Sequence, residues 1–206
     1  MRVAVVGGTG PFGRALATRL RKAGLEVVIG SRDSYRAAMT AAELGVEGAT
    51  NDEAVRSVDL VVLAVKANAA LDTARELEGA IGATPVLSVA SELRFAPGGV
   101  LPTPEAASLA ERIQVEVAGP VLAGLHSLAA ASLGADEPPD EDVFVCGDDL
   151  EAKMLALELA SRVVSGRALD AGPLASARAL EGLTAVIVNL NKRYRAHAGI
   201  RVTGID

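Results

Sequence analysis

Six residues near the amino terminus, Gly8-Thr9-Gly10-Pro11-Phe12-Gly13, have the spacing of a loop that binds the phosphates of a dinucleotide. They follow an apolar, β-branched run at 2–6 and open a segment with a helical pattern, and this context makes the motif specific. We expect Gly8 to permit the tight turn, Gly10 to let the backbone approach a pyrophosphate, and Gly13 to let helix and sheet pack closely. The helix N-terminus would supply N–H groups to the phosphates, and Pro11 suits its first turn.

The end of the next apolar run, 26–30, predicts which dinucleotide is bound. Chains that bind NAD place an Asp or Glu there for the ribose hydroxyls, whereas this run ends in Gly and continues as Ser31-Arg32. A hydroxyl and a guanidinium suit a 2′-phosphate, and Arg36 lies one helical turn further on. Asp33 is open to two interpretations, a ribose ligand in a shifted register or the cap of the following helix, and the second is favoured. The pattern therefore predicts NADP(H).

The elements that must position these residues alternate between short β-branched runs and helical patterns. This alternation predicts an α/β fold, a Rossmann-like, doubly wound and mostly parallel sheet with a smaller C-terminal α/β lobe. We expect strands at 2–6, 26–30, 59–65, 84–89, 114–118, 142–146 and 167–171, and helices near 12–23, 34–44, 52–57, 68–80, 104–112 and 149–164.

Two stretches interrupt the alternation. Residues 90–104 are rich in Gly and Pro, which predicts a loop without a strand or helix of its own, serving as a lid or pocket wall. Thr103 and Pro104 would then cap and begin the next helix. Residues 134–142 carry several acids and two prolines, and they are expected to form a solvated surface loop.

The last segment, 175–195, predicts a helix with one apolar face. That face contains Leu180, Leu183, Ile187 and Leu190. It would pack either on the sheet or against a partner subunit, and we expect the stretch Asn189-Leu190-Asn191 to lie at the contact of a homodimer.

The composition excludes several classes of protein. Half of the 206 residues are hydrophobic, so the chain can bury a substantial core, and the net charge of -6 argues against a nucleic-acid partner. Cys146 is the only cysteine, which excludes an intrachain disulfide, and it is interpreted as a small buried residue rather than a reactive thiol. No Cys/His cluster has metal-ligand spacing, and no apolar run is long enough to span a membrane. We therefore expect a cytoplasmic protein without a metal.

Several segments resemble the NADPH-dependent reductases of the deazaflavin coenzyme F420, also called F420:NADP oxidoreductases. The segments are Gly7-Gly8-Thr9-Gly10 with Gly13, Val28-Ile29-Gly30-Ser31-Arg32, Val145-Cys146-Gly147-Asp148-Asp149, Leu169-Asp170-Ala171-Gly172-Pro173-Leu174 and Glu181-Gly182-Leu183-Thr184. The resemblance implies a hydride passed between C4 of the nicotinamide and C5 of the deazaflavin. Since both carriers bring their own reactive atoms, no catalytic nucleophile, acid or base is expected from the protein.

The resemblance also implies further site residues. Ala67 and Leu71 would lie beside the dinucleotide, and His126 and Ala130 would lie where the two rings meet. His126 would position the acceptor without donating a proton. We expect residues 1–118 to form the NADP-binding region and residues 119–206 to complete the acceptor site.

The chain departs from the family pattern on the side of the acceptor. Lys66 and Ala67 stand where the family often has Pro and an aromatic residue, Ala129 stands where Pro is common, and 91–104 is unlike the family's loop. Two other functions therefore stay open. One is an NADPH-dependent reductase of a flavin or a small carbonyl compound, and the other is a non-catalytic NADP(H)-binding protein.

Overall fold

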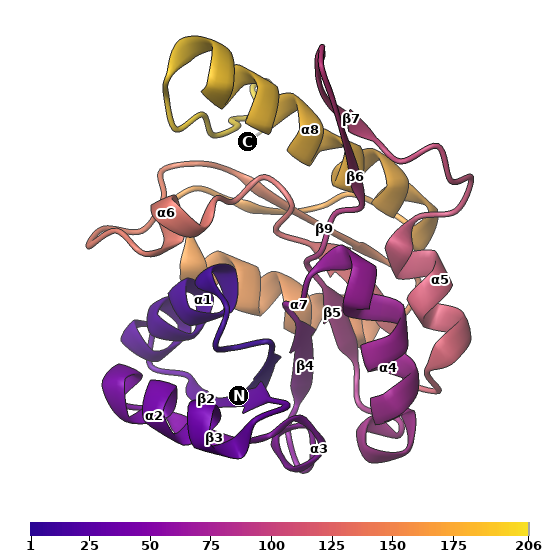
Figure 1. Cartoon of the computed structure of the whole chain (residues 1–206). Helices are drawn as coiled ribbons and strands as arrows, with labels where there is room; N and C mark the ends of the chain where they lie inside the picture. Colours follow the sequence, from indigo (N-terminus) through magenta and orange to yellow (C-terminus); the bar gives the residue numbers. More distant parts are fainter. Residues whose placement is uncertain (206) are drawn as a thin grey trace.

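A single twisted sheet runs through the molecule in the computed structural model, which describes residues 1–205 (Figure 1). Its strands are β1 (Arg2–Val6), β2 (Glu26–Ser31), β3 (Glu47–Thr50), β4 (Leu60–Leu63), β5 (Val86–Ser88), β8 (Val121–Gly124), β9 (Val143–Gly147) and β10 (Ala168–Asp170). The spatial order is β10-β9-β8-β5-β4-β1-β2-β3, and every neighbouring pair is parallel except β8 and β9. The predicted Rossmann-like, mostly parallel sheet is thus confirmed.

Helices cover both faces of this sheet. They are α1 (Pro11–Lys22), α2 (Ser34–Leu44), α3 (Asn51–Ala54), α4 (Ala67–Ile81), α5 (Leu109–Glu116), α6 (Ala130–Leu133), α7 (Leu150–Val163), the 3-10 turn η1 (Leu174–Ser176) and α8 (Ala177–Tyr194). Alternate residues of β1 point to opposite faces, as the pleat requires. Val3 and Val5 pack with α1 and α7, whereas Ala4 and Val6 pack with α4 and α5. Burial on both faces explains why the central strands are continuous apolar runs.

The strand order places the first glycine-rich loop at the switch point of the sheet. The chain winds from β1 outward to β2 and β3, then returns past β1 to β4. The connections after β1 and β4 therefore leave the sheet in opposite directions, and a crevice opens between them at the carboxyl ends of the strands. The residues that local sequence singled out for phosphate binding lie at this crevice.

The region from 104 to 118 differs from the expectation. The strand predicted at 114–118 is wrong, because Ile113 and Gln114 belong to α5 and the next strand, β8, begins only at Val121. The helix does not begin at Pro104 either. Ser108 caps it, in a capping box with Glu111, and Leu109, Ala110 and Ile113 form its buried face. The short alternation in Gln-Val-Glu-Val resembled a strand more than the last turn of a helix.

The prediction that residues 90–104 form a loop without strands is wrong. They contain an antiparallel hairpin of β6 (Leu93–Ala96) and β7 (Gly99–Pro102), which turns at Pro97-Gly98. The hairpin is held by α8, since the Asn189 amide accepts from the N–H of Val100 at 2.8 Å and donates to its carbonyl at 2.7 Å. A partner 89 residues away stabilises these strands, so their own composition did not indicate them. Figure 1 shows the hairpin and α8 together at one end of the molecule.

The predicted final helix is confirmed as α8. Leu180 and Ile187 are buried, whereas Leu190 is 40% exposed. Leu180 packs in the core on the same side of the sheet as α4 and α5, so one face of the helix covers the sheet. The boundary expected between 118 and 119 stays a prediction. It falls in the connection between α5 and β8, and β8 continues the same sheet.

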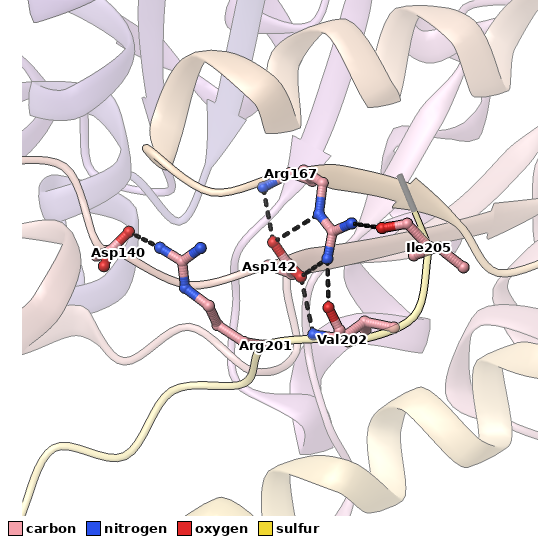
Figure 2. Close-up of polar contacts among 6 residues, drawn as sticks. All are labelled: Asp140, Asp142, Arg167, Arg201, Val202 and Ile205. Atoms are coloured by element: carbon pink, nitrogen blue, oxygen red, sulfur yellow. Dashed lines mark hydrogen bonds and ion pairs between the residues drawn. The ribbon is translucent and has the colours of Figure 1, made fainter.

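An ion pair between a buried carboxylate and a partly exposed arginine holds the C-terminal tail at the edge of the sheet (Figure 2). Asp142 is fully buried, and its carboxylate lies 2.7 Å from the Arg167 guanidinium and accepts from the N–H of Val202 at 2.9 Å. Arg167 also donates to the carbonyls of Val202 and Ile205. The hydrogen bonds from Arg167 hold the pKa of Asp142 well below its usual range. The expectation that 134–142 is wholly solvated is therefore wrong for Asp142, and likewise for Glu141, which is 5% exposed.

Glu141 should make the stability of the fold depend on pH. Burial beneath Gly199 raises the pKa of its carboxyl to about 7 from an ordinary value of 4.5. A carboxyl with a raised pKa favours the folded state fully below pH 4.5, and this contribution is lost as pH rises through 7. The free energy of unfolding should therefore fall by at most about 3 kcal/mol between pH 4.5 and pH 7. We expect Glu141→Gln to abolish this fall.

Chemical denaturation at several pH values between 4.5 and 7.5 measures this effect. The matched control is Glu137→Gln, an exposed acid in the same loop, which should leave the pH profile unchanged. If the free energy of unfolding of Glu141→Gln depended on pH as in the unmodified protein, Glu141 would not be the cause of that dependence.

Candidate functional site

The glycine-rich loop has three positions that leave no room for a side chain, namely Gly7, Gly8 and Gly13. Gly7 has φ +84°, so the left-handed residue of the turn is Gly7 and not Gly8 as expected. A Cβ on Gly8 would lie 2.5 Å from Cβ of Ile29, and a Cβ on Gly13 would lie 2.4 Å from the carbonyl oxygen of Gly7. Gly8 and Gly13 thus let the loop and α1 pack against the sheet, while Gly7 makes the turn.

Gly10 is different, because only one atom lies close to the position that a Cβ would take. It is the N-cap of α1 with φ -81°, and a Cβ there would meet only the Gly7 carbonyl oxygen, at 3.3 Å. Pro11 follows at the first helical position. The first N–H groups of a helix have no partner within the helix, and they carry partial positive charge. The fold therefore presents an anion-binding helix end on which a phosphate can approach the backbone closely.

A cavity of about 790 Å³ lies over this helix end. Its wall includes seven residues that the sequence predicted, namely Thr9, Gly10, Pro11, Phe12, Ser31, Arg32 and Arg36. Gly8 and Gly13 do not line the cavity, because they pack against Ile29 and Gly7. Asn51, Ala69 and Thr73 also line it and were not predicted, as does Lys66, which the sequence singled out only on the side of the acceptor. The Oδ1 atom of Asn51 is buried without a hydrogen-bond partner in the described residues, which marks it as an acceptor that a ligand can satisfy.

The edge of this cavity has the chemistry that a 2′-phosphate requires. Arg32 and Arg36 are exposed, and neither guanidinium forms an ion pair within residues 1–205. The buried Ser31 hydroxyl accepts from the N–H of Asp33 at 3.2 Å. Asp33 caps α2, because its carboxylate accepts from the N–H of Arg36 at 3.0 Å. The favoured interpretation of Asp33 as a helix cap is confirmed, and two guanidinium groups remain available to an anion.

A second cavity of about 260 Å³ adjoins the first and shares Phe12, Ala64, Val65 and Lys66 with it. Ala67 and His126 lie on its wall, as does Ser91, which follows β5. Leu71 and Ala130 line neither cavity. Leu71 belongs to α4 and packs against the core, and Ala130 begins α6. The structure thus brings Ala67 and His126 into one pocket and leaves Leu71 and Ala130 outside its wall.

His126 is the only titratable group on that wall besides Lys66. It is 6% exposed, and burial lowers the pKa of its imidazole to about 4, so the ring is neutral at physiological pH. Its Nδ1 atom lies 3.1 Å from the Ser91 hydroxyl. The preceding residue, Leu125, has φ +63°, a strained conformation for a non-glycine residue. A neutral, desolvated ring of this kind suits hydrogen bonding and not proton storage at neutral pH.

Four residues in the segments that sequence reasoning singled out line neither cavity and instead hold the fold together, namely Cys146, Asp148, Asp149 and Glu181. Burial raises the pKa of the Cys146 thiol to about 11, which confirms its interpretation as an inert buried residue. Asp149 caps α7, whereas Asp148 accepts from the N–H of Leu174 and does not belong to the helix end. Glu181 is buried in α8 and accepts from the N–H groups of Leu109 and Ala110, both at 3.1 Å, so it joins α8 to the start of α5.

Within residues 1–205, no three His, Cys, Asp or Glu side chains gather where they would hold a metal ion. Among the helices of the same part of the chain, none combines the length and the apolarity needed to cross a membrane.

Comparison with known proteins identifies the family. The family model described as "NADP oxidoreductase coenzyme F420-dependent" matches residues 2–92. The F420-dependent NADP reductase of Methanothermobacter thermautotrophicus is 35% identical over all of this chain and 96% of its own. The chain belongs to the F420-dependent NADP reductase family.

Other family members agree with this assignment along the full length. The F420-dependent NADP reductase of Methanocaldococcus jannaschii is 34% identical over 100% of both chains. A crystal structure of a putative F420-dependent NADP reductase from an Arthrobacter species superimposes with a TM-score of 0.81 at 25% identity, over 98% of this chain and 99% of that one. The similarity to this reductase family therefore covers the acceptor side as well as the glycine loop.

Proposed function

We propose that this chain transfers a hydride between NADP(H) and coenzyme F420. The observation that carries the proposal is the pair of adjoining cavities at the carboxyl edge of the sheet, one beside a phosphate-binding helix end and the other beside a neutral histidine. Family membership supports F420 as the acceptor, because the curated relatives are named F420-dependent NADP reductases.

In this proposal the first cavity holds the phosphates and adenosine of NADP(H). Gly10 and the N-terminus of α1 take the pyrophosphate, while Ser31, Arg32 and Arg36 take the 2′-phosphate. Gly8 and Gly13 shape the loop. Thr9, Pro11 and Phe12 form the wall over which the dinucleotide passes toward the second cavity.

The second cavity would hold the nicotinamide against the acceptor ring. Ala67 and His126 line it, and Leu71 and Ala130 would support that wall from α4 and α6. The protein's contribution is orientation and exclusion of water, because hydride transfer between two carriers needs no protein nucleophile. Lys66 lines both cavities, and its ammonium suits an anionic group of the acceptor beyond its ring.

Mixing the purified protein with NADPH and oxidised F420 tests the proposal, with loss of the deazaflavin absorbance as the readout. We expect turnover with F420 and much slower turnover with a free flavin or a small ketone. Faster reduction of the flavin or ketone would favour a reductase of another acceptor. Tight NADPH binding without reduction of any of these acceptors would favour a non-catalytic NADP(H)-binding protein.

We further propose that two copies associate through α8. Val186, Leu190 and Tyr194 are 52%, 40% and 69% exposed on this helix, although its opposite face already covers the sheet. Sedimentation velocity at micromolar concentration should give the mass of a dimer, and Leu190→Lys should shift it to the monomer. A monomer mass for the unmodified protein would exclude this part of the proposal.

The proposal also divides the work between two parts of the chain. Residues 1–118 would bind NADP(H), and residues 119–206 would complete the acceptor site. The protein would act in the cytoplasm.

A further inference from the structure

A chain of hydrogen bonds connects three distant segments behind the second cavity. Ser91 follows β5, His126 follows β8, and Thr184 lies in α8. The Ser91 hydroxyl lies 3.1 Å from Nδ1 of His126 and 2.7 Å from the Thr184 hydroxyl. The Thr184 hydroxyl donates to the carbonyl oxygen of His126 at 2.8 Å. All three residues also line the cavity.

The direction of each bond follows from the number of protons available. A carbonyl oxygen only accepts, so the single hydroxyl proton of Thr184 points at His126. The Thr184 oxygen must then accept from Ser91, which uses the single proton of that hydroxyl. The Ser91 oxygen is left as an acceptor, and the only donor available to it at 3.1 Å is an N–H at Nδ1 of His126. The imidazole therefore carries its proton on Nδ1.

The opposite ring nitrogen is consequently a bare acceptor. Nε2 of His126 is buried and has no hydrogen-bond partner among the described residues. A buried acceptor without a partner is costly unless water or a ligand satisfies it. No charge develops there at neutral pH, since burial lowers the pKa of the ring to about 4.

We propose that Ser91 and Thr184 are positioning residues that lock His126 in the Nδ1–H tautomer, so that Nε2 accepts a hydrogen bond from an N–H group of a ring bound in the second cavity. This inference rests on the proposed function. The required chemistry is an N–H donor at the edge of a planar ring, which both the nicotinamide carboxamide and the deazaflavin ring offer. A ligand that presents an oxygen acceptor at this place would be disfavoured.

Nitrogen NMR of the free protein, labelled with ¹⁵N-histidine, tests the tautomer without any turnover. The chain has only two histidines, and His197→Gln leaves the signals of His126 alone. We expect a protonated Nδ1 and an unprotonated Nε2 in the unmodified protein. Thr184→Val frees the Ser91 proton to point at Nδ1, so the proton should move to Nε2 in part or in full. Thr184→Ser should restore the original pattern, and Thr18→Val, which removes a half-buried hydroxyl in α1, should leave it unchanged.

Binding and steady-state kinetics of the same variants identify the donor. Loss of one neutral hydrogen bond should raise the KM of the substrate that supplies the N–H by about 3- to 10-fold, with a smaller change in kcat. A rise for NADPH points to the carboxamide, and a rise for F420 points to the deazaflavin. A protonated Nε2 in the unmodified protein would overturn the proposal, as would Thr184→Val with an unchanged tautomer and unchanged KM values. Failure of F420 to react would leave the NMR result intact and would count only against the proposed function.

Discussion

Replacement of Arg32 by Ala should weaken NADPH binding by about 10- to 100-fold and barely change NADH binding. The reason is that each charge-assisted hydrogen bond to a phosphate contributes on the order of 1.5–3 kcal/mol. Arg32 and Arg36 lie on the wall of the larger cavity without an ion-pair partner of their own in the described residues. Both guanidinium groups are therefore available to a bound anion. Titration of each dinucleotide into the protein, followed by calorimetry, measures the two affinities.

The matched control for this experiment is Arg162→Ala. Arg162 is a similarly exposed arginine on α7, paired only with Glu158 within its own helix. Its loss should leave both affinities unchanged. The assignment of the 2′-phosphate would be wrong if the unmodified protein bound NADH and NADPH equally, or if Arg32→Ala weakened both dinucleotides to the same extent.

Gly10→Ala should also reduce NADPH affinity by about 10- to 100-fold, with a much smaller loss of stability than Gly13→Ala causes. The backbone of Gly10 allows Ala, and the nearest atom to the new Cβ is 3.3 Å away. The methyl group would instead keep the pyrophosphate from the N–H groups of α1, which removes one charge-assisted hydrogen bond of about 1.5–3 kcal/mol. Affinity for NADH should fall by a similar factor, because both dinucleotides have the pyrophosphate.

Two other glycines separate this effect from damage to the fold. Gly79→Ala in α4 adds a methyl group with no atom within 4 Å, so binding should be unchanged. Gly13→Ala would force a Cβ to 2.4 Å from the Gly7 carbonyl, and both melting temperature and affinity should fall. A Gly10→Ala variant with normal affinity for both dinucleotides would show that the pyrophosphate does not bind at this helix end.

Sequence alone predicted the features whose cause is local. The glycine spacing, the Ser31-Arg32 pair and the cap at Asp33 depend on neighbouring residues, and all lie together around one cavity. The alternation of apolar runs predicted the sheet because burial of parallel strands on both faces leaves a clear pattern. The edge strand β3 was missed, since Glu47 and Gly48 are exposed and give no apolar run.

Features that depend on distant contacts were not predicted. The hairpin of β6 and β7 needs Asn189 in α8, and the tail needs the ion pair of Arg167 with the buried Asp142. Ser91 had no local signal, because its importance comes from partners 35 and 93 residues away. His126 was carried over from the family resemblance alone, and only the structure shows that Nδ1 faces Ser91 while Nε2 is buried without a partner in the described residues.

The central claim is direct hydride transfer between NADP(H) and F420, and the most direct test follows one deuterium atom. NADPH deuterated at one of the two C4 positions is mixed with the protein and oxidised F420 in ordinary water. The mass of the reduced deazaflavin is then measured by mass spectrometry. The proposed function predicts that one of the two deuterated forms yields a product heavier by one deuterium, while the other yields none. Reduced F420 without deuterium from either form, or no reduction at all, would contradict it.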